Sequence, residues 1–92
     1  MDATALLAEL NLDDNDENRK TITALITEAQ DIIIHSVDST KQVSDYDTNL
    51  IFQRAVKTLV TDLYYDRTLS QGMSLGLQMM INHLKGEVVV DD

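Results

Sequence analysis

The chain has 92 residues and a mass of 10.3 kDa. We expect residues 1–92 to form a single domain, because most domains need about 100–150 residues and no length is left for a second core. With 43% apolar and 25% charged residues, the composition is that of an ordinary globular protein, which argues against wholesale disorder. A chain this short buries only about 60–65% of its unfolded surface, so burial against another subunit would add stability.

The formal net charge of -9 is concentrated in the first half, where residues 1–50 contain 11 acidic and 3 basic side chains. Nucleic-acid binding needs a basic stripe, and single-strand binders add stacking aromatic rings. The chain has no cluster of Lys or Arg and only four aromatic residues, which disfavours tight nucleic-acid binding by a monomer. Anionic membranes are disfavoured by the same sign of charge, and no apolar run approaches the roughly 20 residues of a membrane span. The N-terminus lacks the pattern of a signal peptide, and the absence of cysteine excludes disulfides.

The first 70 residues contain neither proline nor glycine, which favours helices separated by polar turns. We predict a short first helix over residues 2–10, capped by Asp2, with Leu6, Leu7 and Leu10 on one face. The polar stretch from Asn11 to Asn18 is predicted to be a solvated loop. We expect Asp14 or Asp16 of this loop to cap the next helix.

The second predicted helix, residues 16–38, has the strongest apolar periodicity in the chain. Its stripe includes Ile22 and closes at Val37. Three consecutive isoleucines, residues 32–34, widen the apolar face, so we expect its C-terminal half to be covered on two sides. The same isoleucines leave a short strand over residues 31–35 as an alternative.

The third predicted helix spans residues 46–66, and Ser44 with Asp47 resembles a weak form of the capping box at its start. The last predicted helix spans residues 75–85, with Gly86 as its C-terminal cap. Residues 86–92 are predicted to be a strand or a frayed tail.

Together these elements predict an all-α fold, a small bundle of about four helices with two long central ones. The expected core is apolar and comes from those two helices: Leu25, Ile26, Ala29, Ile33, Ala55, Val56, Leu59 and Leu63.

We find no pattern typical of a catalytic, cofactor-binding or metal site. Read as a calcium loop from Asp14, the acidic stretch has Arg19 where a glycine should turn the chain and Leu25 where a glutamate should bind. His35 and His83 lack a second histidine at zinc-ligand spacing, although Asp31 and Asp38 could flank His35 as weak ligands. No serine or cysteine stands in a nucleophile motif, so we expect no enzyme.

Two groups are candidates for a subunit interface. Tyr64, Tyr65 and Arg67 end the third predicted helix, and both residue types are enriched at protein interfaces. The alternative is that Tyr64 completes the core and Arg67 complements the helix C-terminus. Met79 and Met80 lie in the last helix, where thioethers adapt to a neighbouring subunit or fill gaps in the core.

The order of these elements resembles the small head-tail connector (adaptor) proteins of tailed bacteriophages, a family often labelled as DNA-packaging proteins. The resemblance covers residues 3–85 and is carried by five segments in order: Leu10–Asp14, Leu25–Ile33, Ala55–Val60, Tyr64–Arg67 and Leu75–Ile81. Members carry a proline before the last helix and a Pro-Tyr-Arg-like ending. This chain has Ser74-Leu75 and Asn82-His83-Leu84-Lys85 at those places.

The resemblance implies a structural virion component without enzymatic activity or cofactor, made in the cytoplasm of a bacterial host from a phage or prophage. It implies a homo-oligomeric ring at the head-tail junction, which docks beneath the portal protein after packaging and binds a tail-completion or stopper protein. DNA would pass through the ring without specific binding, and an acidic lumen would repel its phosphates.

Two other functions are also compatible with the sequence. An acidic protein of phage type could mimic DNA and inhibit a DNA-processing enzyme, but that needs carboxylates spaced like phosphates along one face. A small enzyme or metal-binding module would need His35 with Asp31 and Asp38 to hold a metal.

Overall fold

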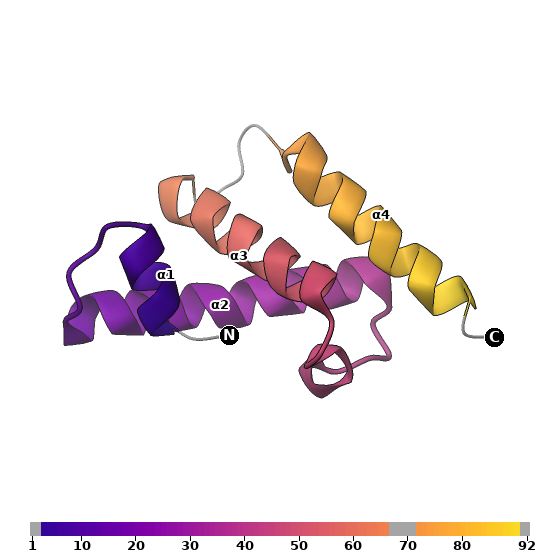
Figure 1. Cartoon of the computed structure of the whole chain (residues 1–92), viewed down its shortest axis with the longest axis horizontal. Coiled ribbons are helices and arrows are strands. Elements are labelled where there is room, and N and C mark those ends of the chain that lie inside the picture. Colours follow the sequence, from indigo (N-terminus) through magenta and orange to yellow (C-terminus); the bar gives the residue numbers. More distant parts are fainter. Residues whose placement is uncertain (1–2, 67–71, 91–92) are drawn as a thin grey trace.

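The computed structural model describes residues 3–66 and 72–90, with the side chains of residues 87–90 excepted (Figure 1). The elements are the α-helices α1 (Ala3–Glu9), α2 (Asp16–Val37), α3 (Leu50–Tyr65) and α4 (Leu75–Val90), with a 3-10 turn, η1 (Val43–Tyr46), before α3. The described residues contain no strand, which confirms the predicted all-α fold of four helices. The strand alternative for residues 31–35 is wrong, because this segment lies inside α2.

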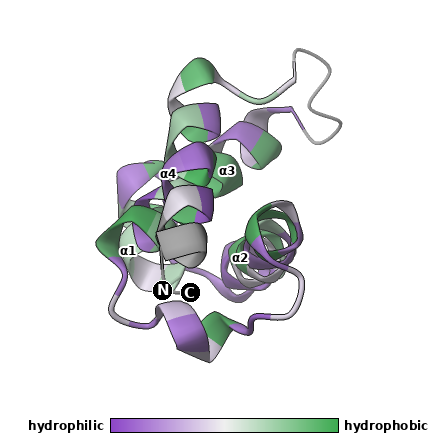
Figure 2. Cartoon of the chain, turned by 90° about the vertical axis from the view of Figure 1, so that its right-hand side faces the viewer, coloured by the Kyte–Doolittle hydropathy of each residue, from purple (hydrophilic) through white to green (hydrophobic). Residues whose placement is uncertain are grey.

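The long helix α2 is the base on which the other helices pack. Seen end-on in Figure 2, α2 lies to one side of α1, α3 and α4. The helices α1, α3 and α4 all contact α2, and α4 also packs against α3. The result is a flat molecule with extents of 44 × 28 × 18 Å. The helices α1, α3 and α4 are therefore all held together by α2.

The end of α1 is a Schellman motif, in which the first residue after the C-cap turns into the left-handed region. Asn11 has that conformation, with a φ of 57°. Its N–H donates to the Ala8 carbonyl at 3.2 Å, and the N–H of Leu12 donates to the Leu7 carbonyl at 2.9 Å. The motif reverses the chain so that Leu12 packs against the core beside the start of α2.

The cap of α2 is Asn15, between the two aspartates that we predicted. Its side-chain oxygen accepts a hydrogen bond from the N–H of Asn18 at 2.8 Å, the bond expected of an N-cap. Asp14 is instead bound to Arg19, and Asp16 lies in the first turn, where its charge suits the helix dipole. The polar loop does cap the helix, as predicted, but through an amide.

The helix α3 begins four residues later than predicted. Asn49 is its cap and accepts a hydrogen bond from the N–H of Phe52 at 3.0 Å. Tyr46 lies in η1 and stacks on Phe52, with ring centroids 4.5 Å apart and an interplanar angle of 13°. The predicted capping box at Ser44 is wrong, because the carboxylate of Asp45 accepts the N–H of Gln42 at the start of η1.

The helix α4 continues to Val90, so the predicted cap at Gly86 and the predicted strand or frayed tail over residues 86–90 are wrong. Gly86 is exposed, and a Cβ added there would meet nothing within 4 Å. The glycine therefore adopts helical backbone in open space, and the helix passes through it. Asp2, the predicted cap of the first helix, lies outside the described residues. Residues 91–92 of the predicted tail lie outside them as well.

One apolar core runs through the described residues, to which all four helices and η1 contribute. All eight core residues predicted from the two long helices are buried. The widened isoleucine face of α2 is covered as expected, since Ile33 and Ile34 are buried and α2 contacts both α3 and α4. The core also includes further residues of α2 and α3 together with residues of α1, η1 and α4: Leu6, Leu7, Ile22, Ile34, Tyr46, Phe52, Val60, Leu77, Ile81 and Leu84. No charged side chain is buried among the residues described.

Candidate functional site

The predicted interface group at the end of α3 divides into a half-buried and an exposed tyrosine. Tyr64 is half-buried and packs against the core, which agrees with the alternative that it completes the core. Tyr65 is 72% exposed, and its ring meets that of Tyr64 edge to face with centroids 5.2 Å apart. The edge-to-face contact with Tyr64 favours this orientation of the exposed Tyr65 ring. Arg67 lies outside the described residues.

The two methionines of the predicted interface differ in their exposure on α4. Met79 is 63% exposed, whereas Met80 is half-buried against the core. Of the pair, Met79 is available to a partner and Met80 contributes to the fold.

An uncharged surface follows the outward side of α4. Five residues at helical spacing are exposed there, and we call them the α4 surface: Leu75, Met79, Asn82, His83 and Gly86. No Asp, Glu, Lys or Arg occurs from Leu75 to Leu84, in a chain of which 25% is charged. Depletion of charge together with exposed methionine and leucine is the composition of an interface centre.

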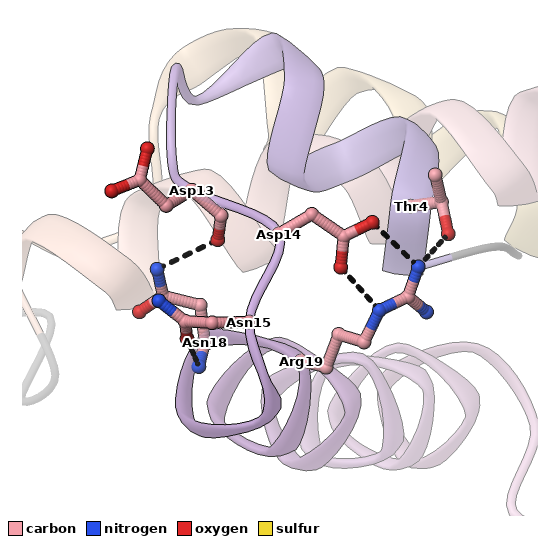
Figure 3. A network of polar contacts seen from close by, with 6 residues as sticks. All are labelled: Thr4, Asp13, Asp14, Asn15, Asn18 and Arg19. Atoms are coloured by element: carbon pink, nitrogen blue, oxygen red, sulfur yellow. Dashed lines mark hydrogen bonds and ion pairs between the residues drawn. The ribbon is translucent and has the colours of Figure 1, made fainter.

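The acidic loop before α2 is tied up in its own hydrogen bonds (Figure 3). The amide of Asn18 donates to the carbonyl of Asp13 at 2.8 Å, while the Arg19 guanidinium binds both carboxylate oxygens of Asp14. Those hydrogen bonds hold the pKa of Asp14 below its ordinary value. The loop acts as a helix cap and a brace for α1.

Of the weak metal set around His35, only Asp31 approaches the imidazole, with its Oδ1 atom 3.5 Å from His35 Nδ1. The Nδ1 atom of His35 lies 2.8 Å from the backbone oxygen of Asp31, one turn earlier in α2. The carboxylate of Asp38 accepts hydrogen bonds from the N–H and hydroxyl of Thr40, which lower the pKa of Asp38. Among the described residues there is no group of three or more His, Cys, Asp or Glu side chains that could hold a metal.

A basic and apolar surface on α3 was not predicted from the sequence. Leu50 is 78% exposed at the start of the helix, and Arg54 is exposed one turn later. Lys57 follows and forms an ion pair with Glu9 of α1 at 2.5 Å. Together with Ala5 and Leu6, these side chains line a depression of about 300 Å³ between α1 and α3, the lower end of the range for small-molecule sites. The helical spacing of Leu50, Arg54 and Lys57 could have predicted from the sequence that they share one side of this helix.

Comparisons with protein-family models, with curated proteins and with solved structures find no match for this chain. Within the described residues, no helix has the length and apolar character needed to cross a membrane.

Proposed function

We propose that this chain is a structural assembly subunit of the head-tail connector type, which forms a ring between a phage portal and the tail. The observation that carries the proposal is the α4 surface. A helix surface that combines exposed apolar side chains with an absence of Asp, Glu, Lys and Arg is typical of a surface that another subunit covers.

The net charge limits how copies can meet. At -9, two copies repel each other unless the contact is neutral or pairs opposite charges. The α4 surface could form such a neutral contact, because it contains no Asp, Glu, Lys or Arg over three turns of helix. Leu75 and Met79 are its apolar anchors. Contacts between identical subunits use such anchors within a polar rim.

The order of elements supports the same proposal. A short helix, a long helix, a third helix ending in Tyr64-Tyr65 and a terminal helix follow one another as the resemblance requires. The acidic character of the chain also suits a channel for DNA, because carboxylates around a lumen repel phosphates from every side.

The test is the size of the assembly. Light scattering across a concentration series, with and without the portal protein of the phage that encodes the chain, should detect a species of many subunits. Negative-stain electron microscopy should show rings in those samples. Absence of rings at every concentration, together with failure to bind the portal, would overturn the proposal.

A further inference from the structure

The exposed side of α3 is basic and apolar toward its N-terminal end and aromatic and acidic toward its C-terminal end. Arg54 and Tyr65 are eleven residues apart, which is three helical turns, so their Cα positions lie within about 20° of each other around the helix axis. Leu50 and Thr61 complete this stripe, with Lys57 and Asp62 at its edges. We call these six residues the α3 face. Its first half is basic and apolar, and its second half is aromatic and acidic.

This pattern is self-complementary when two helices run antiparallel. The N-terminal half of one α3 then faces the C-terminal half of the other, and the same contacts occur twice around a two-fold axis. With the axis between residues 57 and 58, Leu50 lies opposite Tyr65, and Arg54 lies opposite Thr61, one residue from Asp62. We propose that two copies of this chain associate through antiparallel pairing of their α3 faces.

The exposed side chains of this face fit the proposed contact. Tyr65 is 72% exposed and Leu50 is 78% exposed, so an aromatic ring and an apolar side chain can cover one another. The guanidinium of Arg54 would pair with the Asp62 carboxylate and lie within reach of the Tyr65 ring, a favourable cation–π arrangement. Arg54 is fully available, since no ion pair or hydrogen bond engages it in the described chain.

Like charges near the two-fold axis are compensated within each copy. Lys57 would approach its equivalent in the other copy, but each Lys57 is already neutralised by Glu9 of its own α1. The lysine side chain is 45% exposed and Glu9 is 48% exposed, so this pair forms the rim of the contact. The depression between α1 and α3 gives the end of the other α3 a place to lie.

The contact is small. A 16-residue helix is about 24 Å long, and one helix pair with a flanking α1 buries less than the roughly 800 Å² per partner of a stable interface. We therefore expect a weak, reversible dimer with a Kd of about micromolar or above. The pairing does not depend on the proposed ring function, although it would cover Tyr65 and so keep a free copy from using that ring elsewhere.

Charge exchange tests the pairing by sedimentation equilibrium over a concentration series. Arg54→Glu places two carboxylates close to each other, and Asp62→Arg places two guanidinium groups close to each other. Each variant should raise the dimer Kd by about tenfold or more. Lys20→Glu and Glu28→Arg are the matched controls, since they change the net charge equally at exposed positions of α2 and should leave dimerisation nearly unchanged.

Two rescues are specific to antiparallel pairing. The double variant Arg54→Glu/Asp62→Arg should dimerise again, because each contact regains opposite charges. An equimolar mixture of the two single variants should form a heterodimer, since both of its contacts are then complementary. Circular dichroism should show unchanged helicity in every variant, because both side chains lie at the surface.

Monomeric wild-type protein at every concentration would overturn the pairing, and so would Arg54→Glu protein that dimerises as Lys20→Glu protein does. Loss of dimerisation without rescue in the double variant would also contradict it. Rings without this dimer would leave the proposed function standing, and a dimer without rings or portal binding would count against that function alone.

Discussion

Arg19 and Thr4 lie fifteen positions apart in the chain and are joined by a hydrogen bond of 2.8 Å from the guanidinium Nη2 to the threonine hydroxyl. The same nitrogen donates to Asp14 Oδ2 at 2.8 Å, and Nε donates to the other carboxylate oxygen (Figure 3). One side chain thus connects the first turn of α1, the acidic loop and the first turn of α2. Because the groups are partly exposed, the bridge orients α1 more than it stabilises the fold.

Replacing Arg19 with Gln should raise the pKa of Asp14 toward its ordinary value. The hydrogen bond from Arg19 is the largest cause of the lowered pKa, and the variant removes the charge that strengthens it. A carboxyl group with a lowered pKa in the folded state stabilises the protein above its unfolded pKa, and that contribution is lost as the pH falls through the folded pKa. NMR titration of the carboxyl carbons measures the shift directly.

Lys20→Gln is the control for that experiment, since it removes the same charge from the neighbouring exposed position. An Asp14 pKa that moves equally in both variants would show that general charge, and not the bridge, lowers it.

The left-handed backbone of Asn11 predicts an unusual order of substitutions. Asn11→Gly should keep or raise the free energy of unfolding, because glycine adopts a φ of 57° without a steric penalty. Asn11→Ala should lower it by about 1 kcal/mol, since a Cβ is disfavoured in this region. Urea unfolding followed by circular dichroism measures both. Equal stability of the two variants would mean that the turn at the end of α1 relaxes to another conformation.

The helices and the centre of the core could be predicted because their signal is periodic. On α2 and α3 apolar residues recur at helical spacing over several turns, and this spacing places Ile26 and Leu59 inside whatever the neighbours are. The cap at Asn15 could be located only to within one residue, because several adjacent residues can accept the same hydrogen bond.

The remaining features depend on tertiary contacts. Tyr46 stands in a polar stretch without periodicity, and it is buried only because η1 folds back so that its ring stacks on Phe52. Gly86 reads as a helix end, but the propensity of a single glycine does not end α4. The opposite chemistry of Arg54 and Tyr65 could be seen only once α3 was known to expose both.

Leu59→Ala should lower the free energy of unfolding by about 2–5 kcal/mol. The side chain is 0% exposed in α3 and belongs to the central core, so truncation removes buried contacts and leaves a cavity. Leu50→Ala makes the same chemical change on the same helix at a position that is 78% exposed, and its effect should stay within about 0.5 kcal/mol. Chemical denaturation compares the two. Similar losses in both would place Leu59 at the edge of the core.

The last prediction concerns the two neighbouring methionines of α4 and separates assembly from folding. Met79→Asp adds a carboxylate to the α4 surface, where the side chain is 63% exposed, so the monomer should keep its helicity and thermal stability. Ring formation and portal binding should be lost, because the new charge would be buried at the contact without a partner. Met80→Asp adds the same charge to a side chain packed against the core and should lower the melting temperature.

Gln78→Asp is the matched control, since it adds one carboxylate to an exposed position of α4 outside the α4 surface. Circular dichroism melts and electron microscopy of all three variants give the two readouts separately. Rings of normal appearance in Met79→Asp protein would move the subunit contact away from the α4 surface. Unfolding of Met79→Asp protein with a stable Met80→Asp protein would reverse the assignment of the two sides of α4, because a charge disrupts the fold only where its position is buried.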